Sequence, residues 1–421
     1  MWISQNRHER LRQRWLARNA SGRRSPTSRQ RGLRLTPEQL EDRTVPSSFT
    51  AGTVSDLIAD INAANAAGGS NTITLVAGTM FTLTAVDNST DVATGLPVIA
   101  ANDNLTIAGN GDVIQRSTAT GTPRFRLLDV AAGAALTLES LTLQGGLASN
   151  LYSFAAQGGA IYSNGSVTVA NCTIQNNQAS ANVNPADGGA IYCTGSLTVQ
   201  SCTIQNNQAS TLDKADGGAI YCTGSLMVQS CTIQNNEAFS AWAAGPGGAE
   251  GGGIYSSGTL LVQSSTIQNN SAIGANAVSI GSGASAFGGG IYIGGGTVDL
   301  SNVVLDLNSA KGGNGAKGGK TYSTFGHHQS GFPPGNGGNG QGGGLYVASG
   351  TVTLLNTTVQ NNSATGGEKG GGGASAGLGQ GGGLYIDATA SVSLDSFTLA
   401  NVRNNTASTA YPNIYGSCST S

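Results

Sequence analysis

Charged residues are scarce in this chain of 421 residues, at 10%, and aromatic residues make up only 5%. A typical soluble domain is roughly 25% charged. No run of about 18 apolar residues occurs, so the sequence predicts no transmembrane segment. From residue 47 onward the chain holds nine basic and eighteen acidic residues. Such a neutral to acidic body is not typical of a nucleic-acid-binding protein.

Motifs for metal or cofactor chemistry are also missing. The six cysteines show no C-x-x-C spacing, which excludes a zinc site of the usual kind. The calcium-binding nonapeptide of β-helix proteins is absent. His8 lies in the basic leader, and the pair His327 and His328 lies in a glycine-rich segment that we interpret as a polar loop. We therefore expect no metal site and no cofactor.

The chain is rich in glycine, with 65 residues, and contains a repeated sequence motif. Residues 188–210 read GGAIYCTGSLTVQSCTIQNNQAS and residues 217–239 read GGAIYCTGSLMVQSCTIQNNEAF. Looser copies begin at Gly158, Gly251, Gly288, Gly342 and Gly381. Repeats of this period indicate one supersecondary unit stacked on itself.

Within the 188–210 copy the apolar residues alternate as they do in short strands. Ile191 and Cys193 share one face, Leu197 and Val199 the next, and Cys202 and Ile204 the third. Three strands and three turns predict one coil of an all-β, right-handed, single-stranded parallel β-helix. We expect about nine or ten coils, stacked at ~4.8 Å.

A short helix is predicted before the first coil. The segment 53–65 carries an apolar face at helical spacing, with Thr53 or Ser55 as the N-cap and Gly68-Gly69 as the stop. Such a helix would cap the end of the stack. We expect a basic disordered leader over 1–46, the cap and first coils over 47–150, the repeat body over 151–410 and a tail over 411–421.

An Ile-x-x-Asn spacing, with Leu or Val in some copies, places one asparagine at the same corner of seven coils. We interpret these residues as a structural amide ladder, in which each side chain bonds the next. They are Asn177, Asn207, Asn236, Asn270, Asn308, Asn362 and Asn405.

Seven tyrosines form a second column that alternates with the inward aliphatics, so we expect them to face outward with accessible rings. Two interpretations stay open: stacking between coils, and a strip of rings for glycan contact. They are Tyr162, Tyr192, Tyr221, Tyr255, Tyr292, Tyr346 and Tyr385.

Five cysteines fall into two columns, Cys172, Cys202 and Cys231 in one and Cys193 and Cys222 in the other. Neighbouring coils bring such positions within disulfide range. A column of three cannot pair completely, so we favour free, buried thiols, with stapling of adjacent coils as the alternative.

The acidic residues of the repeats are isolated along the sequence, and we expect no two of them at the same position of adjacent coils. Paired carboxylates, which glycoside hydrolases need, are therefore not predicted, and we expect no catalytic residue. The insertions between copies all leave the coil at one corner. The longest, 311–341 and 366–380, are glycine-rich, and we expect them to be flexible.

Three resemblances add to this interpretation. The end of the leader, residues 35–47 (LTPEQLEDRTVPS), resembles the basic LEDR-T-x-P-S leader of many exported proteins of planctomycete-type bacteria, which implies export. Residues 52–146 resemble the start of bacterial β-helix proteins of the pectate-lyase-like superfold. The GGA-I and I/L/V-x-x-N pattern resembles the repeat of polymorphic outer-membrane adhesins.

Together these observations predict a non-catalytic exported protein, extracellular or on the cell surface. Loops gathered on one edge of a rigid scaffold favour binding there, so we expect adhesion or contact with polysaccharide or envelope components. The alternatives are a carbohydrate-active enzyme, a polysaccharide lyase or glycoside hydrolase, and a structural spacer. The last coil near Asn405 shows no cap in the sequence, so end-to-end self-association is a further expectation.

Overall fold

The computed structural model describes residues 46–420, apart from 151–153, 242–247 and 323–328. Its N-terminal helix α2 (Val54–Ala67) begins at Thr53, whose side chain accepts a hydrogen bond from the Asp56 amide at 3.1 Å. The helix ends at Gly68, which has a φ of 62°. Leu57 and Ile61 are fully buried against the first coil. The predicted capping helix is therefore confirmed.

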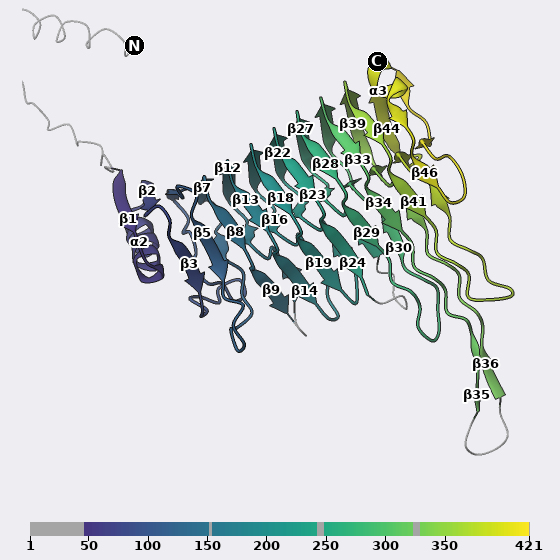
Figure 1. Ribbon diagram of the computed structural model, residues 1–421, viewed down its shortest axis with the longest axis horizontal. Helices are drawn as coiled ribbons and strands as arrows, with labels where there is room; N and C mark the ends of the chain where they lie inside the picture. The colour runs from purple at the N-terminus through teal and green to yellow at the C-terminus, as the bar shows by residue number, and fades with distance from the viewer. Residues whose placement is uncertain (1–45, 151–153, 242–247, 323–328, 421) are drawn as a thin grey trace, which may run out of the picture. The chain divides into compact units, whose positions relative to one another are not determined.

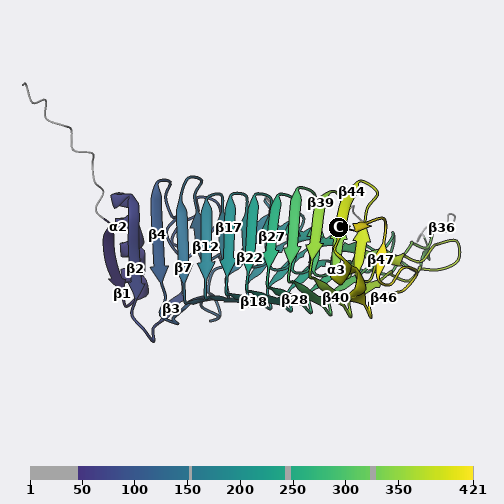
Figure 2. The ribbon, with the colours of Figure 1, turned by 90° about the horizontal axis from the view of Figure 1, so that it is seen from above.

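Behind the helix the chain winds into a parallel β-helix, and the predicted fold class is confirmed (Figures 1 and 2). Each coil of the repeat body contains five short strands, where the sequence predicted three. We number the five parallel sheets in the order in which one coil passes through them. Equivalent residues of consecutive copies pair in register, for example Leu197 with Leu226.

Sheets 1, 2 and 5 are built from the three predicted strands and enclose the main core. Sheet 1 contains β1 (Ser47–Ala51), β2 (Gly69–Leu75), β4 (Asp103–Ala108), β7 (Ala135–Glu139), β12 (Ser166–Ala170), β17 (Ser196–Gln200), β22 (Ser225–Gln229), β27 (Thr259–Gln263), β32 (Thr297–Ser301), β39 (Gly350–Leu355), β44 (Ala390–Leu394) and β48 (Ser419–Thr420). Sheet 2 contains β3 (Met80–Leu83), β5 (Val113–Arg116), β8 (Thr142–Gln144), β13 (Thr173–Gln175), β18 (Thr203–Gln205), β23 (Thr232–Gln234), β28 (Thr266–Gln268), β33 (Val304–Asp306), β40 (Thr358–Gln360) and β45 (Val402–Arg403). Sheet 5 contains β6 (Leu128–Val130), β11 (Ile161–Ser163), β16 (Ile191–Cys193), β21 (Ile220–Cys222), β26 (Ile254–Ser256), β31 (Ile291–Ile293), β38 (Leu345–Val347), β43 (Leu384–Ile386) and β47 (Ile414–Tyr415).

Sheets 3 and 4 come from the segment that the sequence assigned to loops. Sheet 3 contains β9 (Leu147–Asn150), β14 (Gln178–Ala181), β19 (Gln208–Thr211), β24 (Glu237–Ser240), β29 (Ser271–Ile273), β34 (Ser309–Lys311), β41 (Ser363–Thr365) and β46 (Thr406–Ala407). Sheet 4 contains β10 (Ala156–Gln157), β15 (Ala186–Asp187), β20 (Ala215–Asp216), β25 (Gly248–Glu250), β30 (Ser285–Phe287), β37 (Gly340–Gln341) and β42 (Gly379–Gln380).

Sheets 3 and 4 pack face to face through alanine side chains and form a flange beside the main core. The hydrophobic residues of this second core are all alanines, among them Ala209, Ala215 and Ala238. Thr211 and Ser240 lie on the same buried face of sheet 3, so the side chains between the two sheets are all small. The main core is filled instead by Ile, Leu and Val, such as Ile204 and Val199, which are fully buried.

The glycine pairs that open each copy are explained by two different constraints. Gly188 turns the chain with a φ of 63°, a left-handed conformation that costs glycine little. Gly189 has ordinary dihedral angles, but a Cβ there would collide with the carbonyl oxygen of Gly218 in the next coil. Positive φ and close backbone approach therefore require glycine at two adjacent residues.

The long glycine-rich insertions pack against one another through backbone hydrogen bonds where the structure describes them, and their flexibility stays a prediction. We call their packed portions the glycine bundle; it comprises residues 274–284, 312–318, 334–340 and 366–379. The N–H of Gly312 donates to the carbonyl of Thr365 at 2.8 Å, and three residues further along Gly315 donates to Glu368 at 2.8 Å. This step of three recurs between other segments of the bundle. It is the period of polyproline II segments, which bundle closely when glycine faces the neighbour.

The insertions leave the β-helix on the same side, where Figure 1 shows them below the flange. One of them continues into a two-stranded antiparallel ribbon, β35 (Gly319–Tyr322) and β36 (Gln329–Phe332). At the C-terminal end, α3 (Ser396–Ala400) forms the corner between sheets 1 and 2, and a further partial coil with β47 and β48 follows Asn405. No helix in the described residues is long and apolar enough to cross a bilayer.

Candidate functional site

The seven predicted asparagines lie in one column at the corner between sheets 2 and 3, and all are buried. In the Asn207 to Asn236 step, the Asn236 Oδ1 accepts both the backbone N–H of Asn207 and its side-chain Nδ2, each at 3.0 Å. The Asn207 Nδ2 also donates to the carbonyl of Ile174 at 3.1 Å. The pattern continues past the predicted set to Asn413, which accepts from Asn405 Nδ2 at 3.1 Å. These side chains are fully engaged in holding coils together, so they carry no chemistry toward a ligand.

The seven predicted tyrosines, with Tyr415 added, form one continuous stack, which we call the tyrosine column. Successive ring centroids lie 4.5 to 5.2 Å apart with interplanar angles of 3° to 11°. The tyrosine residues are half-buried, so part of each side chain is exposed to solvent. Because each ring covers the face of the next, the faces of the inner rings are not open to a sugar, and glycan contact by these tyrosines stays a prediction. The geometry fits the stacking interpretation.

The first ring of the column is covered by a cation. The Arg126 guanidinium carbon lies 4.5 Å from the centroid of the Tyr162 ring, and its Nη2 donates to the carbonyl of Asp91 at 3.3 Å. Asp129 occupies the position below Tyr162 in sheet 5 and is fully buried. Burial raises the pKa of Asp129 to about 6, although Arg126 acts in the opposite direction.

Three carboxylates, Asp187, Asp216 and Glu250, occupy the same position of three adjacent coils in sheet 4. Register pairs Asp187 with Asp216 and Asp216 with Glu250, so the prediction that no two acids share a position is wrong. We call them the acidic column. They are 4% to 9% exposed, because they lie beside the tyrosine column. The sequence signal was available: each of them immediately precedes a Gly-Gly pair.

Lys214 neutralises part of this acidic column. Its Nζ lies 3.1 Å from Asp216 Oδ2 and 2.8 Å from Glu250 Oε2, and 5.4 Å from the centroid of the Tyr255 ring. Burial raises the pKa of Asp187 to about 6 and that of Asp216 well above its usual value, against the effect of Lys214. Burial alone would lower the pKa of Lys214, but Asp216 and Glu250 raise it overall.

The five column cysteines are free and buried, and Cys418 is free and exposed, as the favoured interpretation predicted. The thiols do more than fill space. Cys202 Sγ accepts from the amide of Cys172 at 3.3 Å and donates to the carbonyl of Gln200 at 3.1 Å. Ser265 replaces cysteine at the same corner and accepts from the Cys231 amide at 3.0 Å. The cysteine thiol therefore makes the same kind of hydrogen bond at this corner as the serine hydroxyl.

Sequence reasoning missed a glutamine column on the outer face of sheet 2. Each amide donates to the carbonyl oxygen of its neighbour at 2.7 to 2.9 Å. The column contains Gln115, Gln144, Gln175, Gln205, Gln234 and Gln268. The third letter of the recurrent T-I-Q triplet was its signal.

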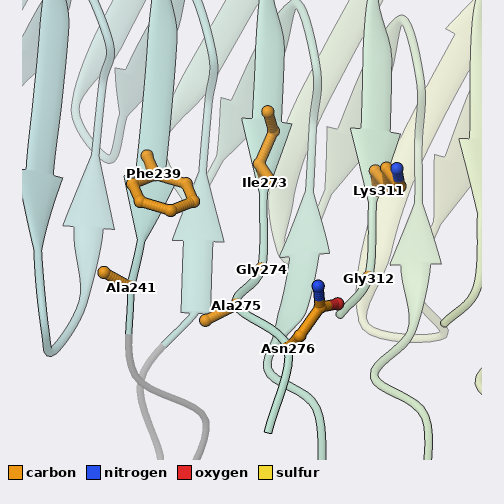
Figure 3. A pocket seen from close by; sticks show the side chains of 8 residues that line it. All are labelled: Phe239, Ala241, Ile273, Gly274, Ala275, Asn276, Lys311 and Gly312. Atoms are coloured by element: carbon orange, nitrogen blue, oxygen red, sulfur yellow. The ribbon is translucent and has the colours of Figure 1, made fainter. Parts of the chain in front are cut away.

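A pocket of about 280 Å³ lies on the outer face of sheet 3, where the insertions leave the coil (Figure 3). Phe239, Ile273 and Lys311 occupy one position of three consecutive coils, on β24, β29 and β34. Phe239 and Ile273 are half-buried and Lys311 is exposed. Ala241, Gly274, Ala275, Asn276 and Gly312 complete the lining. The pocket thus joins an aromatic ring, an aliphatic chain, a cation and an amide.

The glycine bundle fixes the floor of this pocket. The Asn276 Oδ1 accepts the backbone N–H of Asn314 at 2.7 Å, and the Gly274 amide donates to the carbonyl of Lys311 at 2.9 Å. A Cβ on Gly313 would collide with the carbonyl of Ala275. The positions of Asn276 and Ala275 in the pocket therefore depend on Gly313 and Asn314, which lie one coil later in the chain.

A second hollow, of about 500 Å³, lies at the C-terminal end of the tyrosine column. Tyr385, Tyr415 and Asp387 are among its lining residues. The Asp387 Oδ1 accepts from the amide of Thr389 at 3.3 Å. Because this hollow lies away from the insertions, it is not the binding edge that the sequence predicted.

Among the described residues no group of three or more His, Cys, Asp or Glu is arranged to hold a metal ion. The basic leader, including His8 and the export motif up to Val45, lies outside the described residues, as do His327 and His328. The predictions made for them stay predictions.

Comparison with known proteins gives one family match. The sequence pattern of the Chlamydia polymorphic membrane protein repeat matches residues 171–194 and 201–223. Each match begins at the corner after sheet 1 and ends beyond the tyrosine column, so it spans most of one coil. No curated protein matches the sequence.

Three solved structures are similar in fold. The A-modules of the Azotobacter vinelandii mannuronan C-5 epimerases AlgE6 and AlgE4 have 15% and 12% sequence identity and TM-scores of 0.32 and 0.33. The similarity covers 88% and 89% of this chain and 99% of each module. Tailspike protein 3 of bacteriophage CBA120 has 12% identity and a TM-score of 0.28, over 87% of this chain and 62% of the tailspike.

Proposed function

We propose that this chain is a non-catalytic exported β-helix protein, extracellular or on the cell surface, which contacts polysaccharide through the pocket at its loop-rich edge. The observation that carries the proposal is the alignment of Phe239, Ile273 and Lys311 across three coils beside Asn276. The part of the Phe239 ring that is exposed can take up the apolar side of a sugar ring, while a cation and an amide bind its polar groups. The two coils that match the polymorphic membrane protein repeat support a surface location.

The rest of the molecule supplies the rigidity that such a contact needs. Buried columns of asparagine and of cysteine or serine, and a partly buried column of glutamine, connect successive coils. A binding edge on a rigid scaffold loses little conformational entropy when it takes up an extended ligand.

The enzyme alternative has one observation in its favour, the acidic column beside Lys214. A carboxyl group with a pKa of about 6, such as Asp187, has the acidity that a general acid needs near neutral pH. The three carboxylates are however covered by neighbouring side chains, with at most 9% exposure. A substrate would have to displace Lys214 to reach Asp216 and Glu250.

A binding experiment with the full chain tests the proposal. We expect the wild-type protein to bind at least one polysaccharide on an array of plant, algal and bacterial glycans, and Phe239→Ala to weaken that binding about tenfold. Phe397→Ala is the matched control, because Phe397 is 45% exposed on α3, away from the pocket. Unfolding midpoints of both variants check that the fold is intact.

Two outcomes would contradict this assignment. If Phe239→Ala binds as tightly as Phe397→Ala, the pocket is not the site. If the wild-type protein generates reducing ends or unsaturated products from a bound polysaccharide, and Asp216→Asn abolishes that turnover, the enzyme alternative replaces it.

A further inference from the structure

Charge is distributed unevenly between the β-helix and its insertions. In the sequence, the two long insertions, 311–341 and 366–380, carry four lysines and one glutamate. The chain from residue 47 onward carries twice as many acidic as basic residues. The insertions are therefore net positive, whereas the rest of the chain from residue 47 onward, with five basic and seventeen acidic residues, is net negative. Lys311, Lys317 and Lys369 of the insertions are all exposed.

Lys311 is the lysine that faces the pocket, and the described residues offer it no ion pair. Its neighbours in the same column are Ile273 on one side and Thr365 on the other, both uncharged. The closest acidic position on this face of sheet 3 is Glu237, whose Oε1 accepts a hydrogen bond from Gln208 Nε2 at 2.6 Å. Within the pocket the cation is thus available to a ligand.

From these observations we infer, building on the proposed function, that the ligand is an acidic glycan with carboxylate groups. A sugar ring lies on Phe239 and Ile273, and a carboxylate of the same chain pairs with Lys311. The three residues follow the β-helix axis at ~4.8 Å per coil. The glycan therefore lies along that axis, across the strands of sheet 3.

Glu237 determines the orientation in which we expect the acidic glycan to bind. It lies on the same strand and the same face as Phe239, two residues away. A glycan carboxylate placed at this end would meet a like charge, while one placed at the Lys311 end meets an opposite charge. The acidic groups of the ligand are therefore expected toward the C-terminal coils.

The experiment compares two oligosaccharides of equal length, an oligogalacturonate and a neutral cello-oligosaccharide, by calorimetric titration of the full chain. We expect the oligogalacturonate to bind at least tenfold more tightly, and Lys311→Gln to weaken its binding roughly fivefold. Lys311→Arg restores the charge and should restore most of the affinity. Lys317→Gln is the control, since Lys317 is equally exposed but lies outside the pocket.

Salt provides a second measurement. Raising the ionic strength should weaken binding of the oligogalacturonate to the wild type more than to Lys311→Gln, because the lysine contributes a screened charge interaction. Equal affinity for the neutral oligosaccharide, or a Lys311→Gln variant that binds like Lys317→Gln, would overturn the inference and leave glycan binding intact. If no glycan of any charge binds to the wild-type protein, the proposed function itself fails.

Discussion

Replacement of Asn236 by alanine tests whether the corner column holds the coils together. The Asn236 side chain makes four hydrogen bonds. Its Oδ1 accepts two from Asn207, and its Nδ2 donates to the carbonyl of Ile204 at 3.1 Å and to Asn270 Oδ1 at 2.9 Å. At about 1 kcal/mol for each bond, the expected loss of unfolding free energy is about 4 kcal/mol. The largest single contribution is the backbone N–H of Asn207, which stays buried and loses its partner.

The neighbouring residue provides the control. Asn235 is exposed and has a φ of 55°, which glycine adopts without strain. Its backbone amide still reaches the carbonyl of Gln268, so Asn235→Gly should change the unfolding free energy by less than about 0.5 kcal/mol.

Guanidinium unfolding followed by circular dichroism measures the global effect, and amide exchange at Asn207 locates it. Stacked coils can unfold in parts, so the exchange measurement is the decisive one. If exchange at Asn207 is as slow in Asn236→Ala as in Asn235→Gly, the reasoning about the column is refuted.

Three further predictions concern other positions. Leu307 has a φ of 55° where its equivalents in other coils are asparagine, so Leu307→Asn should raise the unfolding free energy by about 1 kcal/mol, and a lower midpoint would count against this. Gly313→Ala should destabilise the glycine bundle by roughly 1–3 kcal/mol and open the pocket at Ala275, whereas Gly372→Ala, which meets no atom within 4 Å, should be neutral; limited proteolysis compares the two. Because the pKa of Asp187 is raised from 3.8 to about 6, the folded state binds the extra proton and stability should fall as pH rises from about 4 through 6, by about 3 kcal/mol. Asp187→Asn should remove that share of the pH dependence of the unfolding midpoint, and an unchanged profile would disprove the assignment.

The parallel β-helix and its capping helix could be predicted because both rest on local periodicity. Alternation of Ile191 and Cys193, and the helical spacing of Leu57 and Ile61, specify which face is buried without knowledge of distant residues. The corner asparagines could be placed because they recur three residues after an aliphatic one.

The acidic column, the flange and the pocket could not be predicted from the same pattern. Asp187 and Asp216 follow insertions of different length. The two residues therefore align between copies only when positions are counted backward from the Gly-Gly pair that follows each of them. The alanines of sheets 3 and 4 are too small to give a strong apolar signal. The pocket depends on the path of the insertions after Phe239, Ile273 and Lys311, and that path is set by backbone hydrogen bonds, which leave no mark in side-chain periodicity.

Because consecutive copies pair in register, whole coils can be added to the β-helix or removed from it during evolution. Asp187 pairs with Asp216, and the strands that follow Asp187, β16, β17 and β18, pair residue by residue with β21, β22 and β23 of the next coil. Excision of residues 188–216 would bring chemically matching surfaces together, since asparagine would again meet asparagine and tyrosine would meet tyrosine. Gain or loss of a whole repeat unit by unequal recombination would thus leave the contacts between neighbouring coils, and their contribution to stability, nearly unchanged. The distance between the N-terminal helix and the pocket on sheet 3 can therefore evolve in discrete increments.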